Sequence, residues 1–195
     1  LIPFALLLVF SPAAQAAAPA GAKNVLFLIA DDLNTMLGAY GDPLARTPNI
    51  DRLAAEGMKF NSAYSGSAVC APSRCVLMTG QHTGHVLRRS NQSKVGLLSL
   101  PAEQPTVARL LKKAGYATGG FGKWGLGNPG TTGVPENLGF DVFFGYYDQV
   151  HAHEYYTDYL VRNSVKVPYQ QSGNHTWQDY SHTHIVDETL KFIEE

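Results

Sequence analysis

The chain has 195 residues, of which 45% are hydrophobic and 16% charged; this suits one ordinary globular core and is too apolar for a disordered chain. Its 15 basic and 16 acidic residues give a net charge of -1, which excludes the basic excess needed to bind a nucleic-acid backbone. We therefore expect one domain, or part of one, and no nucleic acid as a partner.

The first segment of the chain is an apolar run over residues 1–10, followed by small residues. This order is typical of a secretory signal peptide, and we assign residues 1–18 to a partial one. The run is shorter than the roughly 18 apolar residues of a membrane span, so we expect no stable span, with a retained anchor as the alternative. The chain has no initiator Met, which indicates a cut at its start. We expect export to a periplasm or to the extracellular space.

Hydrophobic patterns and turn residues in the rest of the chain predict alternating strands and helices. In chain order we expect a strand over 24–30, a helix over 48–56, a strand over 59–64, helices over 73–79 and 106–114, and a strand over 116–121. The order predicts an α/β fold with a mainly parallel sheet flanked by helices.

The last third of the chain is less regular. Residues 128–173 are rich in Gly, Pro, Tyr and His and show no regular period, as is common in loops that carry function. A final helical pattern between Ile185 and Ile193 leads into no further strand. We therefore expect the domain to be incomplete at its C-terminus.

Two adjacent carboxylates, Asp31 and Asp32, follow the first predicted strand. The carboxyl ends of strands are where open α/β sheets place their sites. Adjacent carboxylates repel each other unless a cation compensates them, and hard oxygen donors suit Ca²⁺ or Mg²⁺. The alternative is an ordinary turn in which an Asp caps a helix.

The most specific string is residues 70–74, Cys-Ala-Pro-Ser-Arg, followed by Thr79-Gly80. It resembles the signature of the sulfatase family, which a formylglycine-generating enzyme recognises in order to oxidise the cysteine. A helix N-terminus offers amides to an anion, and Arg74 offers a forked donor for sulfate oxygens. The alternative is a buried cysteine beside a surface arginine. Cys70 and Cys75 are the only cysteines, so a disulfide framework is excluded and only a local bridge between them is conceivable.

A second string, residues 122–127 with the sequence Gly-Lys-Trp-Gly-Leu-Gly, resembles the Gly-Lys-Trp-His-Leu-Gly of the same family. The resemblance implies that Lys123 points at the sulfate. Gly125 stands where many members have a histidine that contacts the nucleophile. His151 and His153 are our candidates to replace it, and solvated loop histidines are the alternative.

The resemblance to sulfatases implies an alkaline-phosphatase-like fold, with residues 22–195 as the N-terminal portion of the catalytic domain. It implies formylglycine made from Cys70 as the nucleophile, and Ca²⁺, with Mg²⁺ as the second choice, held by Asp31, Asp32 and the residue formed from Cys70. Arg74 and Lys123 then neutralise the sulfate, and a histidine protonates the departing alcohol.

The implied activity is a sulfuric ester hydrolase, similar to arylsulfatases, acting on a sulfated carbohydrate or an aryl sulfate. One alternative is a phosphatase or phosphonate hydrolase of the same fold. Another is an inactive fragment or a glycan-binding remnant, which Gly125 and the early end of the chain suggest.

Overall fold

The computed structural model describes residues 18–91, 99–170 and 179–195; the proposed leader therefore lies outside the described residues, except for Ala18. A four-stranded sheet with the order β1-β2-β3-β4 forms its centre. β1 and β2 are parallel, and β3 and β4 extend the sheet antiparallel. The strands are β1 (Gly119–Lys123), β2 (Val142–Tyr146), β3 (Tyr159–Arg162) and β4 (Val165–Pro168).

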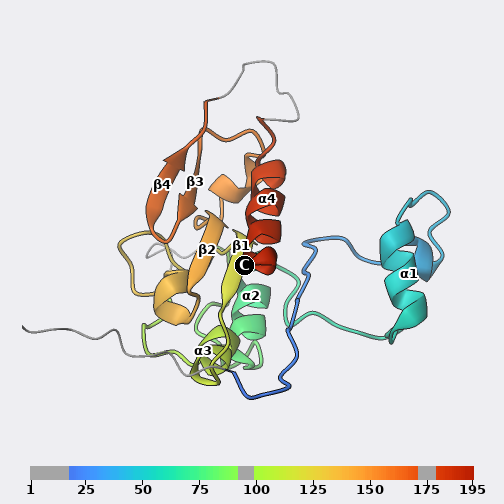
Figure 1. Ribbon diagram of the computed structural model, residues 1–195, viewed down its shortest axis with the longest axis horizontal. Helices are drawn as coiled ribbons and strands as arrows, with labels where there is room; N and C mark the ends of the chain where they lie inside the picture. Colours follow the sequence, from blue (N-terminus) through green and yellow to red (C-terminus); the bar gives the residue numbers. More distant parts are fainter. Residues whose placement is uncertain (1–17, 92–98, 171–178) are drawn as a thin grey trace, which may run out of the picture.

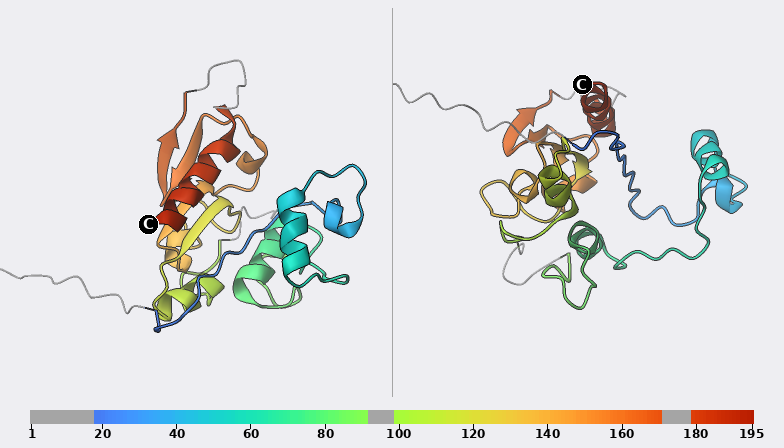
Figure 2. Two further views of the ribbon diagram at one scale, coloured as in Figure 1. Left: turned by 45° about the vertical axis from the view of Figure 1, so that its right-hand side comes forward. Right: turned by 60° about the horizontal axis from the view of Figure 1, so that its bottom comes forward.

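Helices accompany this sheet. In the described ranges they are η1 (Gly38–Tyr40), α1 (Pro48–Glu56), α2 (Cys70–Thr79), α3 (Val107–Lys113), η2 (Pro135–Leu138), η3 (His151–His153) and α4 (Ser181–Glu194). Figure 1 shows α4 packed along β1 and β2, with α2 and α3 beside each other near the lower end of the sheet. In Figure 2, α1 and η1 lie apart from the sheet, at the end of two extended segments.

An aromatic cluster beside the parallel strands forms much of the core. The ring centroid of Trp124 lies 5.9 Å from that of Phe143, which in turn lies 5.1 Å from that of Tyr147, and both pairs meet edge to face. Trp124 Nε1 also donates a hydrogen bond to the Gly133 carbonyl oxygen at 2.8 Å. Because Trp124 directly follows Lys123, this packing fixes the position of Lys123 at the end of β1.

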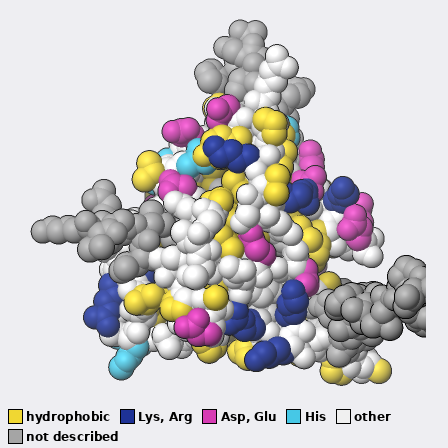
Figure 3. All heavy atoms as spheres, turned by 90° about the vertical axis from the view of Figure 1, so that its left-hand side faces the viewer, with side chains coloured by type: hydrophobic (Ala, Val, Ile, Leu, Met, Phe, Trp, Pro, Cys, Tyr) yellow, Lys and Arg dark blue, Asp and Glu magenta, His cyan; other side chains and the backbone are white. Residues whose placement is uncertain are grey.

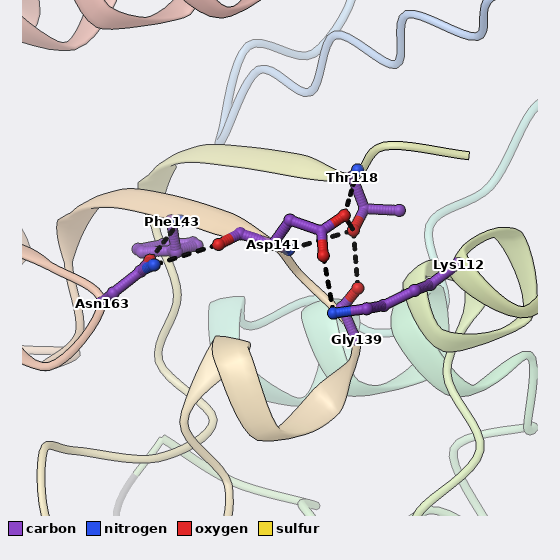
Figure 4. A network of polar contacts seen from close by, with 6 residues as sticks. All are labelled: Lys112, Thr118, Gly139, Asp141, Phe143 and Asn163. Carbon is purple, nitrogen blue, oxygen red and sulfur yellow. Dashed lines mark hydrogen bonds and ion pairs between the residues drawn. The ribbon is translucent and has the colours of Figure 1, made fainter. Parts of the chain in front are cut away.

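A polar network holds the start of both parallel strands against α3 (Figure 4). The Asp141 carboxylate lies 2.6 Å from Lys112 Nζ and accepts a hydrogen bond from the Thr118 backbone N–H at 2.9 Å. Asn163 Nδ2 donates to the Asp141 carbonyl oxygen at 3.0 Å, and Asn163 Oδ1 accepts from the Phe143 N–H at 2.7 Å. These contacts fix the alignment of β1 and β2.

The surface carries both charges. Acidic and basic side chains are interspersed over the described part of the face in Figure 3, and neither sign covers it. Within the described ranges, no helix has the length and the apolar content to cross a membrane.

Most of the predicted helices are confirmed. Helix α1 has the predicted bounds, α3 differs from its prediction by one residue at each end, and the last helical pattern forms α4. Helix α2 begins at Cys70 itself, three residues before the predicted start of that helix at Ser73.

The predicted strands fare less well. The strand predicted over 116–121 begins only at Gly119, and the predictions over 24–30 and 59–64 are wrong, since neither segment pairs with a described strand. Leu26 and Leu28 are 63% and 76% exposed. The irregular stretch predicted over 128–173 contains β2, β3 and β4. The α/β class is right, but the described sheet is mixed, because only β1 and β2 run parallel.

Candidate active site

Three side chains from distant parts of the chain converge beside the end of β1. Asp31 Oδ2 lies 3.0 Å from Arg74 Nη2, on α2, and 3.3 Å from Lys123 Nζ, at the last residue of β1. Arg74 Nη1 donates a second hydrogen bond to the carbonyl oxygen of Lys123. One carboxylate oxygen therefore accepts from both cations, and Arg74 links α2 to β1.

Arg74 and Lys123 determine the charge state of Asp31. Partial burial of Asp31 opposes its ionisation, but the hydrogen bonds and positive charges of Arg74 and Lys123 outweigh that effect and hold the pKa of its carboxyl below the ordinary value. Asp31 is thus ionised at neutral pH, and both cations pair with its carboxylate. The side chains of Arg74 and Lys123 are 18% and 12% exposed, so their charges are only partly screened by water.

Cys70 is the first residue of α2. Its thiol is free and half-buried, and the first turn of the helix carries no acidic residue to offset the positive end of the helix dipole. The neighbouring Ala71 N–H donates to Asn91 Oδ1 at 2.8 Å, which anchors this helix start. Cys70 therefore sits where backbone amides and dipole favour negative charge.

The predicted metal ligands also come together. Asp31, Asp32 and Cys70 each offer one ligand atom, and these three atoms lie within 4.8 Å of one another. The carboxylates suit a hard cation such as Ca²⁺, whereas a thiol does not. Oxidation of the thiol to an oxygen-bearing group would make the donor set uniform, so the residues fit such an ion once Cys70 is modified.

The two candidate histidines make other contacts. His151 Nε2 lies 2.6 Å from Thr157 Oγ1, and the His151 ring stacks on Tyr159 with a centroid distance of 4.3 Å. His153 ends the short helix η3 and is exposed. None of these described contacts joins either histidine to Cys70, and their role as proton donors stays a prediction.

The sequence model of the family described as Sulfatase matches residues 23–195 of the chain. The chain belongs to the sulfatase family. An arylsulfatase of Hemicentrotus pulcherrimus is 36% identical over 203 residues, covering 91% of this chain and 35% of that protein. The N-acetylgalactosamine-6-sulfatase of Canis lupus familiaris is 40% identical over 150 residues, covering 72% of this chain and 28% of that protein.

A solved structure supports the same assignment. The protein BT4656, in complex with its substrate D-glucosamine-2-N,6-O-disulfate, matches with a TM-score of 0.65 and 28% identity, over 83% of this chain and 28% of that one. The sulfatase chain described here spans 35% and 28% of the length of the two curated relatives above. Its α/β fold is therefore that of known sulfatases.

Two residues of this sulfatase chain lie at the site although its sequence gave no reason to choose them. Asn91 was noticeable only as the first residue of an Asn-x-Ser sequon, yet its side chain holds the helix start beside Cys70. Gln149 lies against Gly125, and its amide fills the space that any side chain at 125 would need. An uncharged side chain in an irregular segment belongs to no motif or period, so the sequence alone does not indicate that it lies at the site.

Proposed function

We propose that the protein is a sulfuric ester hydrolase whose nucleophile is made from Cys70. The observation that carries the proposal is the position of Cys70 at the start of α2, with Arg74 of the same helix tied to Asp31 and to the carbonyl oxygen of Lys123. Two cations near a helix N-terminus suit a group with several anionic oxygens, such as a sulfate ester.

The chemistry rests on charge neutralisation. Formylglycine, hydrated to a diol, would supply one hydroxyl to attack sulfur while the S–O bond to the substrate alcohol breaks and the alcohol leaves with a proton. The second hydroxyl would then lose its proton, re-form the aldehyde C=O bond and expel sulfate. Arg74 and Lys123 stabilise the negative charge on the sulfate oxygens, and Asp31 keeps both cations in place through its Oδ2 atom. Asp31 and Asp32, with an oxygen at position 70, would hold Ca²⁺, and Mg²⁺ is the second choice.

The substrate class we infer is a sulfated carbohydrate, with aryl sulfates as surrogate substrates. The support comes from relatives: one is an N-acetylgalactosamine-6-sulfatase, and BT4656 was solved with a disulfated glucosamine. We further propose that residues 1–18 direct export and that residues 22–195 are the N-terminal portion of the catalytic domain. N-terminal sequencing of the exported protein would test the leader; a mature chain that still begins before residue 18 would contradict it.

Kinetics of the full-length protein on an aryl sulfate and the matching aryl phosphate test the function. We expect hydrolysis of the sulfate, and a loss of about a hundredfold or more in Arg74→Ala, because one charged donor to the transition state is removed. Arg46→Ala is the matched control, since Arg46 lies in the segment before α1. Preference for the phosphate would favour the phosphatase alternative, and activity on neither ester would refute both.

Maturation is tested by mass spectrometry of the protein co-expressed with a formylglycine-generating enzyme. The peptide containing Cys70 should be about 18 Da lighter than its sequence mass, because oxygen replaces sulfur and hydrogen is lost. The peptide from Cys70→Ser serves as the unconverted control if the maturing enzyme accepts only cysteine. An unmodified thiol in every copy of an active enzyme would refute the proposed nucleophile.

A further inference from the structure

Gln149 is the least explained polar side chain near the site. It is only 3% exposed, and within the described residues neither its Oε1 nor its Nε2 has a hydrogen-bond partner. An amide that is buried without partners destabilises a fold, and such groups are uncommon in native structures. A role at the site would explain why the chain keeps this amide.

The backbone around Gln149 is held firmly beside the end of β1. The Tyr147 carbonyl oxygen accepts a hydrogen bond from Gly125 N–H at 3.1 Å. On the other side, Asp148 Oδ1 accepts from the backbone N–H of Val150 at 2.8 Å. Gln149 lies between these two anchored positions, and its Oε1 atom lies against Gly125.

Gly125 leaves open the space between Gln149 and Arg74. A Cβ atom placed on Gly125 would lie 2.6 Å from Gln149 Oε1 and 3.9 Å from Arg74 Cδ. Gly125 also has a φ of +77°, which disfavours any larger residue. A side chain at this position, such as the histidine of the sulfatase pattern, would therefore require the Gln149 amide to move.

Arg74 has a matching unpaired donor. Its two terminal nitrogens bond the Lys123 carbonyl oxygen and Asp31, but its Nε, next to Cδ, is buried and has no partner among the described residues. A free acceptor, Gln149 Oε1, and a free donor, Arg74 Nε–H, thus border the same small space.

We propose that Gln149 is a positioning residue for Arg74: its Oε1 accepts the Nε–H and fixes the plane of the guanidinium that faces the sulfate. The consequence for catalysis rests on the proposed sulfatase function, whereas the contact itself does not. Gln149 does not titrate, so it cannot replace the missing histidine as the acid. Its effect is to hold a planar, forked donor in one orientation.

The direct test is the NMR signal of Arg74 Nε–H in the full-length protein labelled with ¹⁵N-arginine, assigned by its loss in Arg74→Lys. In Gln149→Met, which keeps the length of the side chain without the amide, we expect this signal to shift and its hydrogen to exchange at least about tenfold faster. Gln149→Glu restores an acceptor and should restore a protected signal. Gln104→Met is the control, because that amide donates to the Pro105 carbonyl oxygen, away from the site. An unchanged Arg74 signal in Gln149→Met would overturn the proposal.

A second measurement separates positioning from simple packing. Gln149→Met removes the unpaired Nε2 group together with the proposed acceptor of Arg74 Nε–H, so the two effects on stability oppose each other and the melting temperature should stay close to that of the wild type. By contrast, kcat/KM on an aryl sulfate should fall about tenfold. In an Arg74→Lys background the same change should have almost no further effect, because the two residues act together. Independent, multiplicative losses would contradict the proposal. An inactive wild type whose Arg74 signal still depends on Gln149 would refute the sulfatase function and leave the positioning role standing.

Discussion

At the scale of single residues, Asp31 has two uses. The sequence predicts Asp31 as a metal ligand. In the structure its Oδ2 atom also pairs with both Arg74 and Lys123. Two cations this close to each other would repel if the carboxylate were absent. Asp31 therefore holds Arg74 and Lys123 side by side in the structure.

The lowered pKa of Asp31 predicts a specific pH dependence. A carboxyl whose pKa is lower in the folded state stabilises the fold above its unfolded pKa, near 3.8, and this stabilisation is lost as the pH falls through the lower folded pKa. Asp31→Asn should therefore melt at a lower temperature than the wild type from neutral pH down to about pH 4. Below that the gap should close. Melting curves of both proteins over a pH series provide the measurement; a gap that persists unchanged in strong acid would contradict the assignment.

At the scale of elements, the helices were predictable, whereas only one of the strands, β1, was predicted in part. The signals for α1 and α3 are local: Pro48 at a helix start, and Thr106, whose side chain accepts from Arg109 N–H as an N-cap. A strand also needs a neighbouring strand to pair with, and the apolar pattern over 24–30 does not predict whether such a partner is present. The strands within 128–173 were missed because each has only four or five residues, too few for a period to stand out.

The sequence could select the residues of the two motifs at the candidate site, but not its two amide side chains. Cys70, Arg74 and Lys123 belong to strings with a recognisable order, and the structure brings Arg74 and Lys123 together as expected. Gln149 and Asn91 act through burial and backbone contacts, which depend on tertiary packing rather than on any local pattern.

The network around Asp141 predicts unequal effects for the two members of one ion pair. Lys112 is 39% exposed, so Lys112→Ala should lower the free energy of unfolding by less than about 1 kcal/mol. Asp141→Ala also leaves Thr118 N–H without its acceptor and should cost about 2 kcal/mol. Urea denaturation of the two variants measures the difference. Equal losses would mean that the hydrogen bond to Thr118 adds nothing to the surface ion pair.

At the scale of the whole molecule, the segment that carries the two aspartates is held by few contacts. The apolar residues that precede it are exposed. The described hydrogen bonds of the Asp31 side chain are those of its carboxylate with Arg74 on α2 and Lys123 on β1. Asp32 adds a left-handed backbone turn with a φ of 57°. A cation shared by Asp31, Asp32 and an oxygen at position 70 would join this extended segment to the start of α2.

This arrangement predicts that Ca²⁺ stabilises the matured protein and that Asp32 is needed for the effect. At a Ca²⁺ concentration a hundredfold above its dissociation constant, binding to the folded state alone adds about 2.7 kcal/mol to the free energy of unfolding. Chelation should therefore lower the melting temperature of the wild type and leave that of Asp32→Ala unchanged.

Asp187→Ala, at an exposed position on α4, is the matched control and should respond like the wild type. Because Asp32 makes no ion pair described here, unlike Asp31, its loss removes a metal ligand without releasing Arg74 or Lys123. An undiminished response of Asp32→Ala to Ca²⁺ would therefore place the cation elsewhere.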